Sequence, residues 1–210
     1  MILAEESVKA IGGKVPCIIQ VASTVFPDAA FLAKHAESIG ADAISATPPL
    51  FFRYDEDDVY NYYKKLADAV SIPMMIYYNP AAGFHINADI AAKMFEIDNV
   101  TAIKWTSSDY YQMMRLKDIT NGEMNIINGP DEMLVSGLAA GADAGIGTTY
   151  NVMLPEYLAI YRNFNEGNVE KAREIQLKVN RVVTAMLKHE VIPATKAMCT
   201  RLGFESGNAT

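Results

Sequence analysis

The residue in this sequence with the clearest potential for chemistry is Lys104, which lies in the apolar segment 100–106 (VTAIKWT). Strand alternation predicts two sets of side chains, with Thr101, Ile103 and Trp105 on one face and Ala102, Lys104 and Thr106 on the other. An ammonium is rarely buried without a partner, and loss of water favours the neutral amine, which is a nucleophile toward a carbonyl carbon. Lys104 is therefore a candidate nucleophile, although a lysine that reaches solvent or pairs with an acid has the same pattern.

A second candidate is Tyr77, in the preceding apolar run Met74–Tyr78. Consecutive strands of a repeating strand–helix chain are usually neighbours, so Tyr77 can share a face with Lys104. A phenol in that position can pass a proton or hold a carboxylate. An ordinary strand tyrosine with its hydroxyl in a loop fits the pattern equally well.

Two further segments carry polar groups after predicted strands. Asp131 and Glu132 follow the turn at Gly129 and Pro130. Helix capping explains both acids, and two acids at the end of a strand could equally receive the hydroxyls of a polyol. The segment 141–151 (GADAGIGTTYN) has glycines that allow close backbone approach, and taken alone it predicts a general anion-binding loop. It lacks the P-loop lysine and the dinucleotide fingerprint.

Apolar runs and stretches of helical period alternate along most of the chain. We predict strands at Val15–Ala22, Ala43–Thr47, Met74–Tyr78, Val100–Thr106, Met124–Asn128 and Ala144–Thr149, and helices at Pro27–Ile39, Asp55–Val70, Asn87–Ile97, Tyr110–Thr120 and Asp131–Ala140. Each unit takes about 25–30 residues, which implies parallel strands joined by crossover helices. After residue 153 the pattern predicts helices only, at Leu154–Phe164, Val169–His189 and Ala194–Leu202.

Two α/β architectures agree with this alternation, an open doubly wound sheet and a closed (β/α)8 barrel. Six strands are too few for closure, and 210 residues are fewer than the ~250 of a typical barrel. Residues 4–11 have the pattern of a helix end that leads into the first strand, which suggests a barrel without its first two units. The pattern by itself leaves the choice open.

Composition excludes several classes of function. The chain has 18 basic and 25 acidic residues, a net charge of −7 and no basic cluster, which argues against a nucleic-acid partner. No apolar run reaches the ~18–20 residues of a membrane helix, and Glu5 and Glu6 stand where a signal peptide would be positive. Cys17 and Cys199 make no disulfide framework, and His35, His85 and His189 have no metal-ligand spacing. We expect a cytoplasmic protein with no membrane partner.

Taken in order, these segments resemble the N-acetylneuraminate lyase / dihydrodipicolinate synthase family over nearly the whole chain. Residues 76–80 (IYYNP) resemble its tyrosine strand, 103–107 (IKWTS) its Schiff-base strand, and 141–151 its glycine-rich segment. The segments 104–113, 131–132 and 147–151 are more similar to the N-acetylneuraminate lyase branch. The resemblance implies an incomplete (β/α)8 barrel with a C-terminal helical extension. Residues 1–153 would supply barrel strands 3–8, and residues 154–210 the last barrel helix and the extension.

The resemblance also implies an activity and a set of site residues. Lys104 matches the lysine that forms an imine with pyruvate or another 2-oxo acid, and Tyr77 matches the tyrosine that relays protons and contacts the carboxylate. The residues that match the sugar end of the lyase pocket are Thr106, Gly129, Asp131, Glu132, Gly147 and Thr148. A carbon–carbon lyase or aldolase follows, with no cofactor, no metal and a homotetrameric assembly. The alternatives are a dihydrodipicolinate synthase-like enzyme, a sugar-acid aldolase of the same family, or a non-catalytic barrel that binds an acidic sugar.

Three features depart from the family pattern. The family's Gly-Gly-Ser-Thr-Gly-Glu loop, which binds the substrate carboxylate, is absent, because the chain begins in what resembles the family's second helix; it stops before the last helix. Leu50 stands where many members have a tyrosine that reaches a neighbouring subunit, and the turn Pro80–Gly83 is one residue shorter than usual. Missing strands leave unpaired sheet edges, so we expect the 210-residue chain alone to aggregate or to unfold without cooperativity.

Overall fold

The computed structural model describes residues 1–49 and 52–207. The chain divides into two compact units, which are described separately below. Unit 1 contains Met1–Ser107 and Tyr111–Ile126, and unit 2 contains Ser108–Tyr110 and Ile127–Thr210. The six strands follow the order of the chain in one sheet, β1-β2-β3-β4-β5-β6, which confirms the predicted alternation of strands and helices. The division into barrel and helical extension at residues 153 and 154 stays a prediction.

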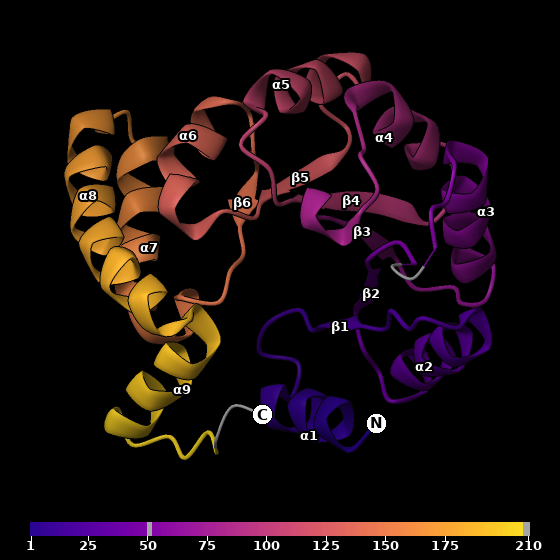
Figure 1. The fold of residues 1–210 in the computed structure, drawn as a ribbon, viewed down its shortest axis with the longest axis horizontal. Helices are drawn as coiled ribbons and strands as arrows, with labels where there is room; N and C mark the ends of the chain where they lie inside the picture. The colour runs from indigo at the N-terminus through magenta and orange to yellow at the C-terminus, as the bar shows by residue number, and fades with distance from the viewer. Residues whose placement is uncertain (50–51, 208–210) are drawn as a thin grey trace. The chain divides into compact units, whose positions relative to one another are not determined.

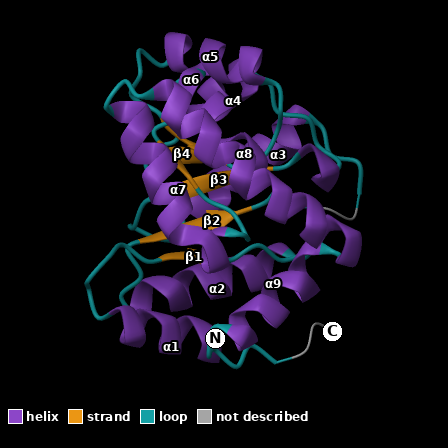
Figure 2. Ribbon diagram, turned by 90° about the vertical axis from the view of Figure 1, so that its left-hand side faces the viewer, coloured by secondary structure: helices purple, strands orange, loops and turns teal. Residues whose placement is uncertain are grey.

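Unit 1 is built on four parallel strands, β1 (Ile18–Gln20), β2 (Ala43–Ala46), β3 (Met74–Tyr78) and β4 (Val100–Trp105). Its helices are α1 (Ile2–Ile11), α2 (Phe26–Ser38), α3 (Glu56–Ala67), α4 (Ala88–Phe95) and nearly all of α5 (Tyr110–Ile119), with a short 3-10 turn η1 (Pro80–Ala82). The helices α2, α3 and α4 follow one another along one side of the strands (Figures 1 and 2). The other face of the strands carries Lys104.

Local sequence explains where the helices of unit 1 begin and what they bury. Asp55 caps α3 by accepting the backbone N–H of Asp58, whose side chain in turn accepts the N–H of Asp55, a complete capping box. Asn87 caps α4 in the same way by accepting the N–H of Ile90. On α2, alanines at helical spacing face the sheet, and all three are fully buried: Ala29, Ala33 and Ala36. Small residues at this contact let the helix backbone approach the strands closely.

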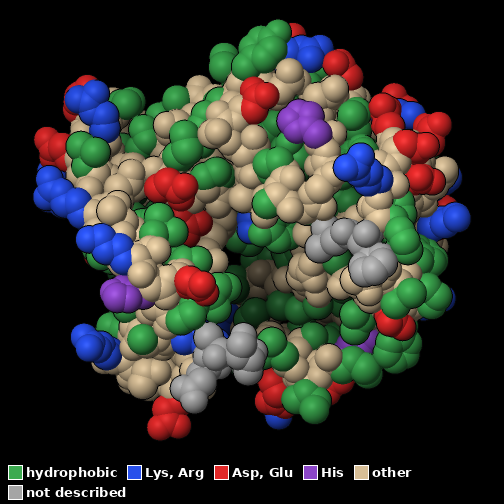
Figure 3. Space-filling model, viewed as in Figure 1, with side chains coloured by type: hydrophobic (Ala, Val, Ile, Leu, Met, Phe, Trp, Pro, Cys, Tyr) green, Lys and Arg blue, Asp and Glu red, His purple; other side chains and the backbone are tan. Residues whose placement is uncertain are grey.

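Unit 2 contains the short strand β6 (Ala144–Gly145), which pairs in parallel with the end of β5 (Asn125–Asn128). Its helical elements are η2 (Asp131–Met133), α6 (Leu134–Ala139), α7 (Tyr150–Asn165), α8 (Val169–Met186), η3 (Leu187–His189) and α9 (Val191–Arg201). The helices α7 and α8 lie side by side (Figure 1) and bury a core that includes Leu134, Leu138, Tyr157, Ile160, Val179 and Val183. The outer face of α8 carries charges of both signs (Figure 3), with ion pairs between Arg173 and Glu170 and between Lys171 and Glu174.

Several predicted elements differ from the structure, among them the strand predicted at Ala144–Thr149, of which only Ala144–Gly145 forms as β6. The first strand was predicted from Val15, but β1 begins at Ile18, and Val15 is 59% exposed. The helix predicted at Asp131–Ala140 is divided into η2 and α6. The helix predicted from Leu154 begins four residues earlier as α7, because Pro155 cannot donate a backbone hydrogen bond and the chain is kinked at Met153. The proline marks a kink rather than a helix start.

The described part of the chain contains no helix that is long and apolar enough to cross a membrane. Both cysteines are free, Cys17 in a buried position and Cys199 in a partly exposed one.

Candidate active site

Lys104 and Tyr77 lie opposite each other in the ladder between β3 and β4. The Nζ atom of Lys104 is 4.0 Å from the centroid of the Tyr77 ring, and both side chains are partly buried. Lys104 forms no ion pair with any residue that the structure describes. The structure therefore brings together the two residues that the sequence singled out for catalysis, with an aromatic ring as the neighbour of the amine.

The orientation of Lys104 depends on its neighbours in the strand. Ile103 and Trp105 are fully buried toward the helices, and the Trp105 ring packs edge-on against Tyr78 with 4.8 Å between the ring centroids. The Tyr78 hydroxyl lies 3.1 Å from Nδ1 of His85. Because alternate side chains of a strand face opposite sides, this packing turns Lys104 and Tyr77 to the other side. Thr101 leaves the predicted pattern, because the ladder shifts register between Met74 and Met75 and Thr101 is exposed.

Thr106 follows β4 on the face of Lys104. Its backbone N–H donates to the carbonyl of Tyr78 at 2.9 Å, but its hydroxyl is buried and has no hydrogen-bond partner among the described residues. Buried hydroxyls are normally hydrogen-bonded, so an unpaired one next to a candidate nucleophile is a group available to a ligand. On the far side of β3, strand β2 contains the buried Ser45 in register with Met75, and a lone serine in an apolar strand gives no sequence pattern that would predict a function for it.

In unit 2 the carboxylate of Asp131 is held by hydrogen bonds. Its Oδ2 atom accepts from the backbone N–H of Thr149 at 2.7 Å and from the Thr149 hydroxyl at 2.5 Å. The Thr149 hydroxyl lies 2.6 Å from the hydroxyl of Tyr157, and both residues are 1% exposed. A Cβ added to Gly147 would lie only 1.5 Å from the Oδ1 atom of Asp131. Asp131 thus stabilises the N-terminus of α7, and glycine at 147 is required for its carboxylate to fit.

The backbone of the η2 turn is held from α8. The Gln176 side chain donates to the carbonyl of Asp131 at 3.2 Å and accepts the N–H of Val135, also at 3.2 Å. Asn180, one turn along, donates to the carbonyl of Glu132 at 3.0 Å. The Glu132 side chain itself is exposed. These contacts fix the position of the turn, and the Glu132 carboxylate is exposed to solvent.

The remaining predicted residues of unit 2 are Gly129, which is buried after β5, and Thr148, which is partly buried before α7. The carbonyl of Thr148 accepts from the Asn151 amide at 2.9 Å. Gly129 follows Asn128, a buried side chain whose amide donates to Pro130 at 2.7 Å and whose carbonyl oxygen accepts from the Tyr110 hydroxyl at 3.2 Å. The sequence indicated the acids and glycines of this unit, but it did not predict that Thr149, Tyr157, Gln176 and Asn180 hold them in place.

Three phenols in unit 2 have strongly perturbed acidity. Burial raises the pKa of Tyr157 and of Tyr150, and the negative charge of Asp131 raises both further. Burial, followed by the charge of Glu132, raises the pKa of Tyr110. The rings of Tyr150 and Tyr157 are stacked with 3.8 Å between their centroids, and the Tyr150 hydroxyl is buried without a partner among the described residues. At neutral pH these phenols therefore stay protonated.

Among the residues that the structure describes, no group of three or more His, Cys, Asp or Glu side chains could hold a metal ion. Leu50, which was singled out as a departure from the family pattern, lies outside the described residues.

Comparison with known proteins identifies the family of this chain independently of its site residues. The model of the dihydrodipicolinate synthetase family matches residues 1–210. An N-acetylneuraminate lyase of Rhizobium meliloti is 33% identical over 198 residues, which cover 94% of this chain and 66% of the relative. N-acetylneuraminate lyase 2 of Escherichia coli is 34% identical over 91% of this chain and 63% of its own length. The chain therefore spans about two thirds of the length of these curated relatives.

Solved structures resemble the whole chain. The structure of CdNal from Clostridium difficile in complex with mannosamine has a TM-score of 0.95 and 27% sequence identity, and it covers 99% of this chain and 71% of its own. A catalytic lysine mutant of the Ruminococcus gnavus sialic acid aldolase has a TM-score of 0.85 and 33% identity over 88% of this chain and 61% of its own. These matches confirm an α/β fold of the (β/α)8 barrel type, incomplete in this chain.

Proposed function

The chain belongs to the dihydrodipicolinate synthetase family, and on this premise we propose that it is part of an aldolase-type lyase that uses Lys104 to form a Schiff base with a 2-oxo acid. The observation that carries the proposal is the juxtaposition of Lys104 and Tyr77 across β3 and β4, at 4.0 Å from amine to ring. A relative described as a sialic acid aldolase with a mutated catalytic lysine supports the same chemistry. The substrate class that we propose is pyruvate joined to a sugar aldehyde.

The reaction follows from the chemistry of an amine and a ketone. The neutral Nζ atom of Lys104 attacks the C2 carbonyl carbon, and a proton donated to the resulting hydroxyl lets it leave as water and gives a cationic iminium. In the cleavage direction the C4 hydroxyl loses its proton, the C3–C4 bond breaks, and its electron pair moves to the iminium nitrogen and gives an enamine. Protonation of the enamine at C3 and hydrolysis release pyruvate and return the free lysine. Each step needs a proton donor or acceptor near C2 and C4.

Tyr77 is our candidate for that proton transfer. Its ring lies against the amine of Lys104, and its hydroxyl has no hydrogen-bond partner among the described residues. A phenol that is not engaged elsewhere can donate to the departing water and accept the proton of the C4 hydroxyl. The unpaired hydroxyl of Thr106 is suited to bind the carboxylate or the first hydroxyl of the substrate. Gly129, Asp131, Glu132, Gly147 and Thr148 are our candidates for the sugar end of the site.

We extend the proposal to the assembly and compartment that the resemblance implies, a homotetramer in the cytoplasm. Analytical ultracentrifugation of a chain of the relatives' full length tests the assembly. A species with the mass of four chains is expected, and a monomer would contradict it.

Trapping of the imine tests the proposed chemistry directly. Incubation with pyruvate and borohydride should reduce the iminium to a stable secondary amine, which mass spectrometry of peptides locates on Lys104. The Lys104→Arg variant should lose the adduct, because a guanidinium forms no imine. The matched control is Lys93→Arg, since Lys93 is paired with Glu56 and Asp57 on the surface and its loss should leave the adduct unchanged.

The outcome separates an enzyme from a barrel that only binds sugars. The same experiment is repeated with a chimera in which a relative's N-terminal third precedes this chain. Absence of an adduct on Lys104 in both proteins would overturn the lyase proposal and leave the binding-only alternative.

A further inference from the structure

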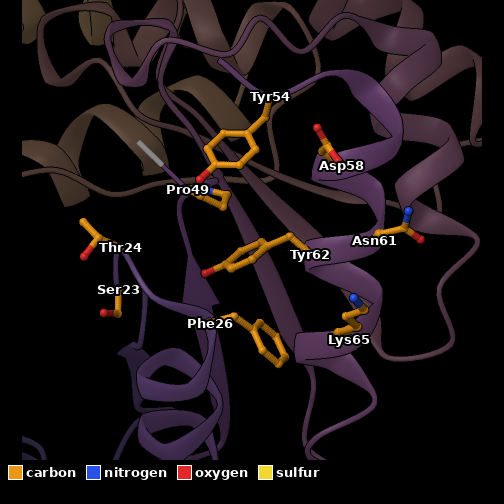
Figure 4. Close-up of a pocket in the computed structure, with 9 residues that line it drawn as sticks. All are labelled: Ser23, Thr24, Phe26, Pro49, Tyr54, Asp58, Asn61, Tyr62 and Lys65. Atoms are coloured by element: carbon orange, nitrogen blue, oxygen red, sulfur yellow. The ribbon is translucent and has the colours of Figure 1, made fainter. Parts of the chain in front are cut away.

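Unit 1 contains a cavity of about 290 Å³ between the N-terminal end of α2 and one face of α3 (Figure 4). It is lined by two loop hydroxyls (Ser23 and Thr24), three aromatic rings (Phe26, Tyr54 and Tyr62), Pro49, and three polar residues of α3 (Asp58, Asn61 and Lys65). Neither Lys104 nor Tyr77 lines it. The proposed aldol chemistry gives this cavity no role.

The hydroxyl of Tyr62 is the clearest sign that the cavity takes a ligand. The residue is only 7% exposed, and its hydroxyl is buried without a partner among the described residues. Figure 4 shows the ring extending from α3 into the cavity, with the hydroxyl on the side where Ser23, Thr24 and Pro49 lie. The adjacent Tyr63 shows the normal arrangement, because its buried hydroxyl donates to the carbonyl of Ala46 at 3.0 Å. Burial raises the pKa of Tyr62 to about 12, so its hydroxyl is a donor at neutral pH.

Lys65 supplies an uncommitted positive charge at the same cavity. It forms no ion pair with any described residue, whereas the adjacent Lys64 is paired with Asp68 at 3.3 Å. Asp58, Tyr62 and Lys65 are spaced so that they lie on one face of α3. Asp58 is exposed, and its carboxylate accepts the N–H of Asp55 within the capping box, which leaves further lone pairs for a ligand hydroxyl. The face therefore has a cation at one end and an acceptor at the other.

Aromatic rings give the cavity apolar walls beside its polar groups. The rings of Phe26 and Tyr62 meet edge to face with 6.1 Å between their centroids. Such walls suit the C–H groups of a carbon chain or ring, while the surrounding hydroxyl, amide and carboxylate groups suit its hydroxyls. Asp58 and Lys65 are seven residues apart, about 10 Å along the helix axis. When one hydrogen-bond length is subtracted at each end of this span, the remaining distance fits a molecule of about six carbons.

We propose that this cavity is a second small-molecule site, distinct from the Lys104 site, for a polyhydroxylated carboxylic acid of about six carbons. The carboxylate pairs with Lys65 and accepts from the Tyr62 hydroxyl, and the ligand hydroxyls donate to Asp58 and bond to Asn61, Ser23 and Thr24. The site does not depend on the lyase proposal, because no bond is made or broken in it.

Isothermal titration calorimetry with D-gluconate tests the proposal on the chimera in which a relative's N-terminal third precedes this chain. Gluconate has six carbons, a carboxylate and no ketone, so it cannot form an imine with Lys104. We expect saturable binding with a Kd of about 1 mM, and binding at least about tenfold weaker to D-sorbitol, which lacks the carboxylate. No saturable gluconate binding up to about 50 mM would overturn the proposal.

Variants locate the binding within the molecule. Lys65→Gln should weaken gluconate binding at least about tenfold, and Tyr62→Phe, which removes only the unpartnered hydroxyl, about threefold to tenfold. Lys64→Gln is the matched control on the same helix and should leave the Kd within about twofold. Circular dichroism checks that each variant is folded; Tyr62→Phe breaks no hydrogen bond among the described residues. Equal gluconate binding by Lys65→Gln, Tyr62→Phe and the parent chain would place the ligand elsewhere and overturn the site.

Discussion

The two units place their candidate functional groups in opposite ways. In unit 1 the polar groups next to Lys104 are free of side-chain partners among the described residues, as the Thr106 hydroxyl shows. In unit 2 the Asp131 carboxylate is held by two hydrogen bonds from Thr149, and the backbone of its turn is held by Gln176. Groups that must react need to be uncommitted, whereas groups that shape a pocket need to be fixed. The difference agrees with the proposed function, in which Lys104 and Tyr77 of unit 1 react, and it gives the Asp131 carboxylate a structural role within unit 2.

The largest effect should come from removing the Tyr77 hydroxyl. In Tyr77→Phe we expect proton transfer to slow by about 10²–10⁴-fold, because the enamine loses its proton donor. Exchange of pyruvate methyl protons with deuterated water, followed by NMR, measures this step in the protein that forms the adduct. Stability should be unchanged. Tyr78→Phe, at the adjacent position, is the control. Its exchange rate should equal that of the parent protein, and its free energy of unfolding should fall by about 1 kcal/mol because the hydrogen bond to His85 is lost. Equal exchange rates in both variants would assign the proton transfer to another group.

A side chain at position 147 should disrupt unit 2 without touching Lys104. In Gly147→Ala the new methyl group would lie 1.5 Å from the Asp131 carboxylate, so either the carboxylate or the loop must move. We expect a loss of at least about 3 kcal/mol in the free energy of unfolding, measured by urea denaturation of the chimera that carries a relative's N-terminal third. Gly167→Ala is the control, because its Cβ would meet open space and the positive φ of 82° should reduce stability by only about 1 kcal/mol. Similar losses would mean that the Asp131 contact does not constrain position 147.

The hydrogen bonds of Thr149 should contribute a smaller amount. Thr149→Val removes its hydroxyl bonds to Asp131 and Tyr157 and leaves two buried groups with fewer partners. We expect a loss of about 1–3 kcal/mol in the free energy of unfolding. Thr148→Val, one residue earlier and only partly buried, should change it by less than about 0.5 kcal/mol. If the Asp131 contact matters for the pocket, Thr149→Val should also raise the KM for the sugar-bearing substrate more than it lowers kcat.

The smallest effect should be the acid sensitivity of a surface contact in unit 1. The Ser71 hydroxyl and backbone N–H both donate to Glu37, at 2.6 and 2.7 Å, and these bonds lower the pKa of the carboxyl below 4.5. A lowered pKa gives stability that is present above pH 4.5 and is lost as the pH falls through the folded value. At about pH 5 the parent chain should therefore have a higher Tm than Glu37→Gln, and this difference in Tm should become smaller as the pH falls to about 3. The exposed Glu123→Gln should leave the pH profile unchanged.

Sequence pattern was sufficient where local rules decide the structure. The bounds of β3 agree residue for residue with the prediction, and strand alternation correctly placed Lys104 and Tyr77 on one face. The helices predicted from Asp55 and from Asn87 do begin at these residues, which are their N-caps. These features depend on residues that are close in the chain, and apolar strands and helix caps have a strong local signal.

The pattern was insufficient where distant residues decide. The role of Asp131 depends on Thr149, 18 residues later, and its backbone is held by Gln176, 45 residues later. Nothing near Asp131 distinguishes a helix cap for its own helix from an acceptor for the next one. The only available signs were a glycine-rich run just before a helix and a glutamine among the apolar positions of α8. Neither feature predicts a contact with Asp131 until the structure shows which residues lie next to it.

The register shift in β4 has a consequence for how this strand can change in length during evolution. Met74 pairs with Val100 and Met75 with Ala102, so Thr101 is one residue more than the ladder needs. Deletion of Thr101 would restore a regular ladder and keep Lys104 opposite Tyr77. Deletion of Ala102 instead would do the same, because Thr101 would take its place opposite Met75, whereas loss of two residues from this segment would turn the amine toward the helices. The strand can therefore lose one residue ahead of Lys104 and keep the amine opposite Tyr77.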